Sequence, residues 1–449
     1  MKKRIVILGS GESGTGAALL AQRQGFDVFV SDRGAIKDVY KKVLDVKGIA
    51  WEEGQHTLDK ILNANEIIKS PGIPEKSEVM QAVRAKGINV IGEIEFGYRY
   101  AGKCTIVGIT GSNGKTTTTM LTYHLLQHAG LNVRMGGNVG NSFATMVYED
   151  LEQGKMGADR IFVLEISSFQ LDDIQQFRPH IAMLLNITPD HLDRYEYKLE
   201  NYVRSKFRIA MNQKRGDLFI TNANDANIGA YLNENPDVVH CRMVRIRRSD
   251  FKNGYVWIGR SFAFDLASTN LRGPHNMFNA ACAIRVAMRL GVEQGRISEG
   301  LFSFAPPAHR LERVAEVKGV NYVNDSKATN VDSVFYALQA MDTPTVWIVG
   351  GQDKGNDYSP LLKLVKQKVK AIVCMGMDNT KIIGVFKKYK LPMVETRSAV
   401  EAVRAAAGFA EEGDTVLLSP ACASFDLFKN YEDRGAQFRE AVLSMTNGQ

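Results

Sequence analysis

Residues 105–118 read TIVGITGSNGKTTT, and this stretch decides the fold class of the chain. A short apolar run leads into a glycine-rich turn, and Lys115 stands where a helix can begin. A strand, a glycine-rich loop and a helix in this order bind phosphate, because backbone N–H groups and the helix dipole face the anion. Gly108 and Gly114 are one residue further apart than in the usual pattern. We predict a bound triphosphate, with Lys115 at its terminal phosphates and the Thr116 hydroxyl on Mg²⁺.

Two further predicted strand ends carry residues that suit a metal ion. Glu165 ends one apolar run, and His191 follows another between two aspartates. A carboxylate at the carboxyl end of a strand in such a domain is placed to bind Mg²⁺. The alternatives are a helix-capping acid and a structural histidine. Lys206, on a helix predicted over 202–211, resembles by itself a solvated surface lysine.

A second glycine-rich turn lies near the start of the chain. Residues 9–14 read GSGESG, between a strand predicted at Arg4–Leu8 and a helix, and Asp32 closes the next strand. This spacing is typical of a dinucleotide site, and the same geometry holds any nucleoside diphosphate. A tight turn without a ligand remains the alternative.

Polar clusters follow predicted strands in the C-terminal third. They are residues 324–330 (NDSKATN), 350–355 (GGQDKG) and 419–426 (SPACASFD). Ligands of open α/β sheets gather at the carboxyl ends of strands. Each cluster alone is explained by turn chemistry, but the three together predict a second substrate site.

Short apolar runs alternate with helical patterns along all 449 residues, which predicts α/β architecture in about three domains. The strand and glycine-rich turn at residues 105–114 repeat the pattern found at the start of the chain. This repetition and the Pro306-Pro307 pair suggest domains over 1–101, 102–306 and 307–449. Asn253-Gly254 lies between apolar runs and predicts a hairpin.

Composition excludes several classes of protein. The net charge of +7 suits anionic substrates, and the basic stretch at 242–248 has neither interleaved aromatics nor a nucleic-acid module. Five widely spaced cysteines without a CxxC predict neither disulfides nor a zinc site, so we expect the cytoplasm. No apolar run approaches the roughly 18 residues of a membrane span. We expect a monomer that binds neither nucleic acid nor membrane.

Six stretches, taken in order, resemble the Mur ligases of bacterial cell-wall synthesis. They are TGSNGKTT (110–117), LEISSFQ (164–170), NITPDHLDRY (186–195), GPHNMFN (273–279), DSKATN (325–330) and SPACASFDLFKNYEDRG (419–435). The last two point to members that add D-glutamate. The resemblance covers essentially the whole chain and implies three domains with mostly parallel sheets: a Rossmann-like N-terminal domain, a P-loop ATPase and a Rossmann-like C-terminal domain.

The resemblance implies ATP-dependent amide bond formation. The carboxylate of UDP-N-acetylmuramoyl-L-alanine would attack the γ-phosphate, and the amine of D-glutamate would then displace phosphate from the acyl phosphate. Charge neutralisation and positioning dominate such chemistry. The implied cofactors are ATP and Mg²⁺ at two sites, with Lys206 carbamylated.

The resemblance also implies roles for individual residues. Nucleotide contacts fall on Gly111, Ser112, Asn113, Gly114, Lys115, Thr116, Thr117, Asn276, Asn279, Arg310 and Asp325. Contacts to the UDP-linked substrate fall on Glu12, Ser13, Asp32, Arg33, Ser70, Pro71, Gly72, Asn138 and His191. The D-glutamate pocket falls on Lys327, Thr329, Lys354, Ser424, Phe425 and Tyr431. Metal ligands are Thr116, Glu165, His191 and Lys206, and the catalytic residues are Lys115, His191 and Lys206.

Three other functions are weighed against this one. Another Mur-type or polyglutamate-type amide ligase would share most of these motifs. A nicotinamide-dependent oxidoreductase would use the turn at 9–14 but leaves the loop at 111–114 unexplained. A nucleotide-regulated binding protein leaves Glu165 and His191 unexplained.

Overall fold

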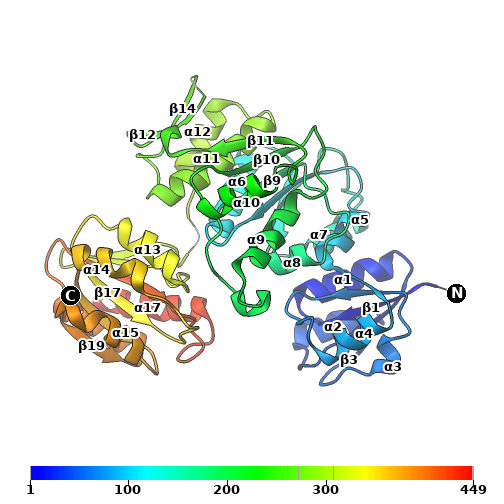
Figure 1. The fold of residues 1–449 in the computed structure, drawn as a ribbon, viewed down its shortest axis with the longest axis horizontal. Helices are drawn as coiled ribbons and strands as arrows, with labels where there is room; N and C mark the ends of the chain where they lie inside the picture. Colours follow the sequence, from blue (N-terminus) through cyan, green and yellow to red (C-terminus); the bar gives the residue numbers. More distant parts are fainter. Residues whose placement is uncertain (1, 260, 272, 307, 447–449) are drawn as a thin grey trace. The chain divides into compact units, whose positions relative to one another are not determined.

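The computed structural model describes residues 2–259, 261–271, 273–306 and 308–446. The chain packs as two compact units, Met1–Thr269 with Phe278–Phe304, and Asn270–Met277 with Ala305–Gln449. Both are built from mostly parallel sheets with flanking helices, which confirms the predicted α/β class (Figure 1). The boundary between residues 101 and 102 stays a prediction, and Pro307 lies outside the described residues.

The N-terminal sheet has five parallel strands in the order β3-β2-β1-β4-β5. The strands are β1 (Arg4–Leu8), β2 (Asp27–Ser31), β3 (Ala50–Glu52), β4 (Glu66–Lys69) and β5 (Asn89–Gly92). The helices are α1 (Glu12–Arg23), α2 (Asp38–Val46), α3 (Leu58–Ile61), α4 (Glu78–Ala85) and α5 (Glu93–Tyr100). The predicted strand at residues 4–8 coincides with β1, whose apolar side chains are buried on both faces of the sheet. Such two-sided burial is typical of parallel sheets.

The next sheet has six parallel strands in the order β11-β10-β9-β6-β8-β7. The strands are β6 (Thr105–Thr110), β7 (Val133–Gly137), β8 (Ile161–Glu165), β9 (Ile181–Leu184), β10 (Leu218–Asn222) and β11 (Arg242–Ile246). The helices of this part are α6 (Lys115–His128), α7 (Phe143–Glu152), α8 (Ser168–Asp172), α9 (Leu199–Phe207), α10 (Ala226–Glu234), α11 (Pro274–Arg289) and α12 (Gln294–Ser303). Helix α6 begins at Lys115, as the glycine-rich turn predicts.

A small antiparallel sheet is added to this part of the chain. It consists of β12 (Phe251–Lys252), β13 (Tyr255–Ile258) and β14 (Phe262–Asp265). Asn253 and Gly254 join the first two strands with φ of 53° and 78°. A two-residue hairpin turn of this kind requires positive φ at both positions, so the predicted hairpin is confirmed.

The second unit contains a six-stranded sheet in the order β15-β16-β20-β17-β18-β19. The strands are β15 (Glu312–Val317), β16 (Val320–Asn324), β17 (Thr345–Gly350), β18 (Val369–Met375), β19 (Met393–Thr396) and β20 (Thr415–Ala421). Only the edge pair β15–β16 is antiparallel among these neighbours. The helices are α13 (Val331–Gln339), α14 (Leu362–Lys368), α15 (Thr380–Phe386), α16 (Ala399–Phe409) and α17 (Tyr431–Thr446).

Two predicted elements differ from the observed ones. The helix expected over 202–211 is α9, which begins at Leu199 and passes into a 3₁₀ turn at Arg208–Ala210. The strand expected over 180–187 ends at Leu184, because the carbonyl oxygen of Asn186 accepts from Ser112 instead of continuing the sheet. Both differences arise from tertiary contacts that a local pattern does not contain.

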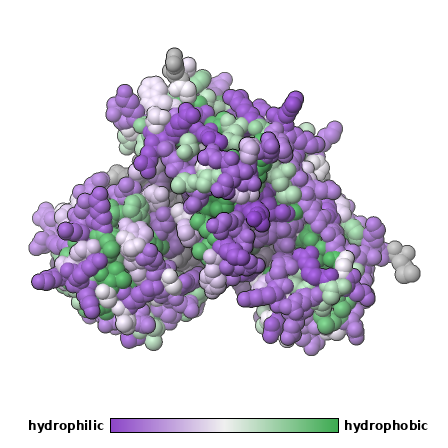
Figure 2. Space-filling model, in the orientation of Figure 1, coloured by the Kyte–Doolittle hydropathy of each residue, from purple (hydrophilic) through white to green (hydrophobic). Residues whose placement is uncertain are grey.

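The surface of the protein is mainly polar on the face shown in Figure 2, where apolar residues lie in small separate areas. Among the helices that the structure describes, none combines the length and apolarity of a membrane span.

Gly14 permits the tight turn between β1 and α1. A Cβ added there would lie 1.8 Å from the carbonyl oxygen of Gly9. We therefore expect Gly14→Ala to lower the free energy of unfolding by at least about 1 kcal/mol, although alanine favours helices by a similar amount. Urea unfolding measures the change.

Gly229 in α10 is the matched control, because a Cβ there would meet no atom within 4 Å. Gly229→Ala should stabilise the protein by up to about 1 kcal/mol. Equal effects at the two glycines would contradict the close approach at Gly14.

Candidate functional site

The loop between β6 and α6 contains the glycine-rich turn that the sequence predicts to bind phosphate. Gly114 is the N-cap of α6 and has a φ of 82°, which a glycine adopts without strain. A Cβ at Gly114 would lie 2.7 Å from Oδ1 of Asn279, so this predicted nucleotide contact lies directly against the loop. Thr116 and Thr117 are buried in the first turn of the helix. The N-terminus of α6, where backbone N–H groups suit an anion, therefore lies directly behind this loop.

Side chains from the segment after β9 hold this loop in shape. Asn186 accepts from the backbone N–H of Asn113 at 2.8 Å and donates to its carbonyl oxygen at 3.0 Å. The Ser112 hydroxyl donates to the carbonyl of Thr188 and accepts from its N–H, both at 2.9 Å. These contacts fix the loop without a ligand. Asn186 and Thr188 were not among the predicted site residues, although both lie in the NITPDHLDRY stretch.

Two lysines converge on one carbonyl oxygen of the loop. The Nζ of Lys115 donates to the carbonyl oxygens of Gly111 at 2.7 Å and Ser112 at 2.9 Å. The Nζ of Lys206 donates to the same Gly111 oxygen at 2.9 Å. The Lys115 ammonium places positive charge at this point, which suits a polyphosphate.

Lys206 is not a surface residue. Its side chain is 1% exposed, which corrects the expectation of a solvated lysine on this helix. Burial, helped by the nearby Lys115 ammonium, holds the pKa of Lys206 well below its usual value. Lys115 is half-buried in the loop.

Glu165 has the geometry of a cation ligand. It ends β8, is 3% exposed, and its Oε1 accepts from the Asn138 side chain at 2.9 Å. Its Oε2 is buried and has no hydrogen-bond partner among the described residues. A buried carboxylate oxygen without a partner is costly unless a ligand completes it. Glu165 and the Thr116 hydroxyl therefore fit a Mg²⁺ ion, which prefers hard oxygen ligands.

His191 lies in the left-handed region with a φ of 52°, just before a 3₁₀ turn at Leu192–Tyr195. Its ring packs edge-on against Phe169 at 5.2 Å between centroids, and its side chain is 47% exposed. The charge of Asp190 raises the pKa of Lys206 against the effect of burial, and Nε2 of His191 lies 3.6 Å from Oδ2 of Asp190. No group of three or more His, Cys, Asp or Glu side chains forms a metal cluster within the described ranges.

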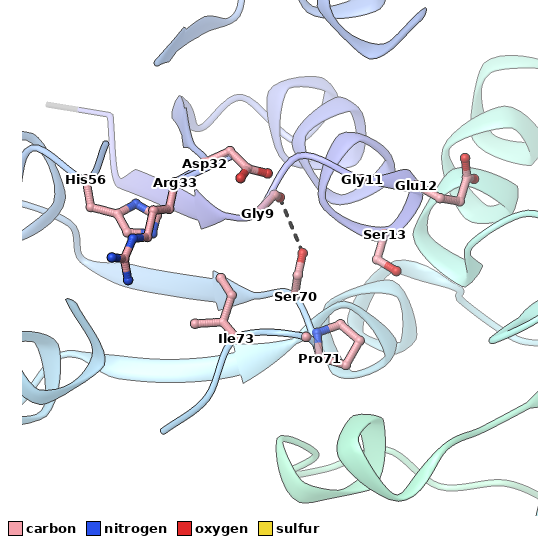
Figure 3. Close-up of a pocket in the computed structure, with 11 residues that line it drawn as sticks. Gly9, Gly11, Glu12, Ser13, Asp32, Arg33, His56, Ser70, Pro71 and Ile73 are labelled. Atoms are coloured by element: carbon pink, nitrogen blue, oxygen red, sulfur yellow. Dashed lines mark hydrogen bonds between the residues drawn. The ribbon is translucent and has the colours of Figure 1, made fainter. Parts of the chain in front are cut away.

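A cavity of about 360 Å³ lies at the carboxyl ends of β1, β2 and β4 (Figure 3). Seven of the first 101 residues were predicted to contact the UDP-linked substrate. All seven line this cavity. They are Glu12, Ser13, Asp32, Arg33, Ser70, Pro71 and Gly72. His56 and Ile73 also line the cavity, and the sequence analysis missed both.

Two acids of this cavity hold protein groups as well. Asp32 accepts from the backbone N–H groups of Ser10 at 2.7 Å and Gly34 at 2.8 Å, which fixes the turn after β1. Glu12 accepts from the N–H of Ser142 at 3.1 Å, at the N-terminus of α7. In Figure 3 its carboxylate points away from Gly9 and Asp32. Glu12 therefore links the cavity to α7.

The second unit gathers its polar clusters at one edge of its sheet. Strands β16, β20 and β17 are adjacent and parallel, so the segments after them meet. Lys327 lies 4.8 Å from the ring centroid of Tyr431, and the Ser326 hydroxyl donates to the Tyr431 carbonyl at 2.8 Å. Ser424 is buried, Phe425 is 68% exposed, and Thr329 and Lys354 lie in the neighbouring loops.

Arg434 organises this edge and was missed by the sequence analysis. Its guanidinium is 1% exposed and donates to the Ser326 hydroxyl at 3.0 Å, the Ser326 carbonyl at 2.8 Å and the Cys422 carbonyl at 3.2 Å. It thereby joins the segments after β16 and β20. Burial raises the pKa of Asp325 to about 7, and the Ser419 hydroxyl donates to it at 2.9 Å.

The predicted nucleotide contacts are divided between the two units. Asn279 belongs to the first unit, and Asn276, Arg310 and Asp325 belong to the second. Within the second unit, the segment 270–277 joins residues 305–449, and the ring of His275 lies 5.7 Å from that of Tyr336.

Three family descriptions match the chain in succession. The MurD N-terminal domain matches residues 4–79, the Mur ligase middle domain 109–287 and the Mur ligase glutamate ligase domain 309–422. A UDP-N-acetylmuramoylalanine–D-glutamate ligase of Christiangramia forsetii is 51% identical over 99% of this chain and 100% of its own length. The chain belongs to the Mur ligase family.

Other members agree in sequence and fold. The D-glutamate ligase of Cytophaga hutchinsonii is 48% identical over 99% of this chain and 100% of its own length. The solved UDP-N-acetylmuramate–alanine ligase MurC from Thermotoga maritima has a TM-score of 0.60 at 18% identity, over 99% of this chain and 100% of that one. Mur ligases are ATP-dependent enzymes that form amide bonds. The prediction of this family is therefore confirmed.

Lys115 provides the first test of the loop. We expect Lys115→Ala to lower the rate of ADP release from ATP by about 100-fold or more, because a positioned cation stabilises charge that develops during transfer. The mutant should keep its melting temperature within a few degrees, since the loop is held by Asn186 and Thr188.

Lys155→Ala is the matched control, because Lys155 is exposed in the same part of the chain. It should retain wild-type turnover. A folded Lys115→Ala protein with wild-type turnover would remove the loop from the reaction.

Proposed function

We propose that this protein is an ATP-dependent ligase that adds D-glutamate to UDP-N-acetylmuramoyl-L-alanine, forming ADP and phosphate, in the synthesis of peptidoglycan precursors. The observation that carries the proposal is the site around Gly111. Two lysines donate to its carbonyl oxygen, and Glu165, one strand away, has a buried oxygen without a partner among the described residues. Full-length similarity to D-glutamate ligases supports the choice of substrates.

The first step activates a carboxylate. A carboxylate oxygen of the muramoyl-alanine attacks the γ-phosphorus of ATP, the bond from that phosphorus to the bridging oxygen breaks, and ADP leaves. Lys115 and the backbone N–H groups of residues 111–117 hold the phosphates in line, and the positive field of the loop offsets the charge on the transferring group. Mg²⁺, held by Thr116 and Glu165, would supply additional charge neutralisation when bound.

The second step forms the amide. The neutral amine of D-glutamate attacks the acyl carbon, and phosphate leaves from the tetrahedral intermediate after the nitrogen loses a proton. The protein contributes mainly by positioning, since both reactants are bound and the acyl phosphate is already activated. The loops after β9 and β7, which carry His191 and Asn138, would hold the sugar-linked substrate near the phosphates.

The D-glutamate pocket is assigned to the edge of the second unit that Arg434 organises. Lys327 and Lys354 supply positive charge for a dicarboxylate, and Ser424 and Thr329 supply hydroxyl donors. Buried donors reject a ligand that leaves them unpaired more strongly than an apolar pocket rejects a missing methylene.

The first 101 residues are assigned to the UDP group. The N-terminus of α1 faces the cavity at Gly11 and Ser13 and suits a diphosphate (Figure 3). Nicotinamide chemistry would need a nearby substrate site, and it leaves the Gly111 loop and the edge of the second unit without a role. We further propose that the enzyme works as a monomer in the cytoplasm, where its five free cysteines stay reduced.

A second Mg²⁺ site is assigned to His191 and Lys206, in addition to the one at Thr116 and Glu165. An ammonium at Lys206 would repel the cation. The lowered pKa of this buried amine favours the neutral form. The neutral amine can attack CO₂, form a C–N bond and release one proton, which leaves a carbamate with two hard oxygen atoms.

The amino-acid substrate is tested directly. We expect kcat/KM for D-glutamate to exceed that for D-alanine and L-glutamate by about 1000-fold, with UDP-N-acetylmuramoyl-L-alanine and ATP as co-substrates. Release of ADP and phosphate is the readout. Comparable values for D-alanine would contradict the pocket, and preference for a different amino acid or a growing glutamate chain would favour another ligase of the family.

The carbamate is tested by substitution and rescue. Lys206→Arg and Lys206→Ala should both lose nearly all turnover, because neither can form the carbamate. Acetate should partly restore Lys206→Ala, since it can fill the gap with carboxylate oxygens.

Lys198→Arg is the control, because Lys198 precedes the same helix and its side chain is 64% exposed. Turnover of all variants is compared at fixed Mg²⁺ concentration and ionic strength. An active Lys206→Arg enzyme would end the carbamate hypothesis, since a guanidinium cannot form that group.

A further inference from the structure

His56 lines the first-domain cavity, and neither the sequence motifs nor the proposed mechanism uses it. It follows β3 and is half-buried. In Figure 3, His56 and Arg33 lie on the opposite side of the cavity from Gly11 and Ser13, where α1 begins. If the diphosphate occupies the helix N-terminus, the nucleobase lies toward His56 and Arg33.

A hydrogen-bond relay fixes the tautomer of His56. Ser31 and Glu52 are paired across β2 and β3, and the Ser31 hydroxyl donates to Oε1 of Glu52 at 2.8 Å. The same hydroxyl oxygen lies 2.8 Å from Nδ1 of His56. A further group near the hydroxyl, the carbonyl of Gln55 at 3.4 Å, is also an acceptor. The single hydroxyl proton is therefore directed away from His56, and Nδ1 must be the donor.

Charge and burial support this assignment. Burial opposes ionisation of Glu52, but hydrogen bonds from Thr57, Ser31 and Lys60 hold its pKa below the usual value, so it is an acceptor at neutral pH. Burial, together with the Arg33 charge and against the pull of Asp32 and Glu52, lowers the pKa of His56. A neutral imidazole protonated at Nδ1 carries a lone pair at Nε2.

We propose that His56 reads the base of the nucleotide by offering its Nε2 lone pair to the imino N3–H of uracil. Uracil presents a carbonyl, an N–H and a second carbonyl along one edge. Neutral Nε2 matches the central N–H, and the guanidinium of Arg33 supplies donors for a carbonyl. Cytosine presents a lone pair at N3 in place of the N–H, so the Nε2 contact becomes mismatched. Its amino group in place of O4 also removes one of the two carbonyls that Arg33 could contact. This inference rests on the assignment of the first domain to a UDP group.

Nucleotide selectivity of the full-length protein tests the proposal. Calorimetric titration should give UDP a Kd at least about tenfold lower than that of CDP, since a mismatched buried polar pair is worth about one such factor. His56→Phe should raise the Kd of UDP about tenfold and leave the Kd of CDP nearly unchanged. The ratio of the two Kd values should therefore fall towards one. Ser31→Ala should lower this UDP-to-CDP selectivity partway, because it removes the hydroxyl that fixes the tautomer of His56.

His240→Phe is the matched control, because His240 is exposed and does not line the cavity. This variant should bind UDP and CDP with the affinities of the wild-type protein. A wild-type UDP-to-CDP ratio in folded His56→Phe would overturn the role of His56 and leave the UDP site intact. Binding of NADH without a response to UDP, in the wild-type protein, would overturn the assignment of the first domain itself.

Discussion

The common direction of neighbouring strands is the constraint on which every candidate site depends. Within each large sheet, parallel strands end at the same edge, so loops far apart in the sequence become neighbours. Strands β9, β6, β8 and β7 are adjacent, and their loops bring together His191, Lys115, Glu165 and Asn138. The same rule brings the segments after β16, β20 and β17 together in the second unit. A single architectural choice therefore repeats in three sites of different chemistry.

Polar side chains that hydrogen-bond to the loops convert this topology into fixed geometry. Asn186 holds the phosphate loop, Asp32 holds the turn after β1, and Arg434 joins two loops of the second unit. Each satisfies backbone groups that a short loop would otherwise leave unpaired. Asn186 and Arg434 act on the backbone of loops at the candidate sites, whereas Asp32 also lines the cavity itself.

Local sequence signals predicted the positions of individual strands and helices. The apolar run at residues 4–8 and the helix start at Lys115 coincide with β1 and α6, because strand and helix signals there depend on adjacent residues. The family resemblance also implied seven substrate contacts that share one cavity. The burial of Lys206 was not predictable, since nothing beside it in the sequence shows that α9 packs against the Gly111 loop. His56 was missed because its role depends on the pairing of Ser31 with Glu52 across two strands.

The hydrogen bonds that Asn186 and Ser112 make in the glycine-rich loop at residues 111–114 have a thermodynamic consequence. A glycine-rich segment loses much conformational entropy when it is ordered, because glycine has the most backbone freedom to lose. Here that entropy is lost when the chain folds, and an arriving nucleotide meets N–H groups already in place. The free energy released by phosphate contacts thus remains available for charge neutralisation during the reaction, and the cost of ordering the loop becomes part of the stability of the protein.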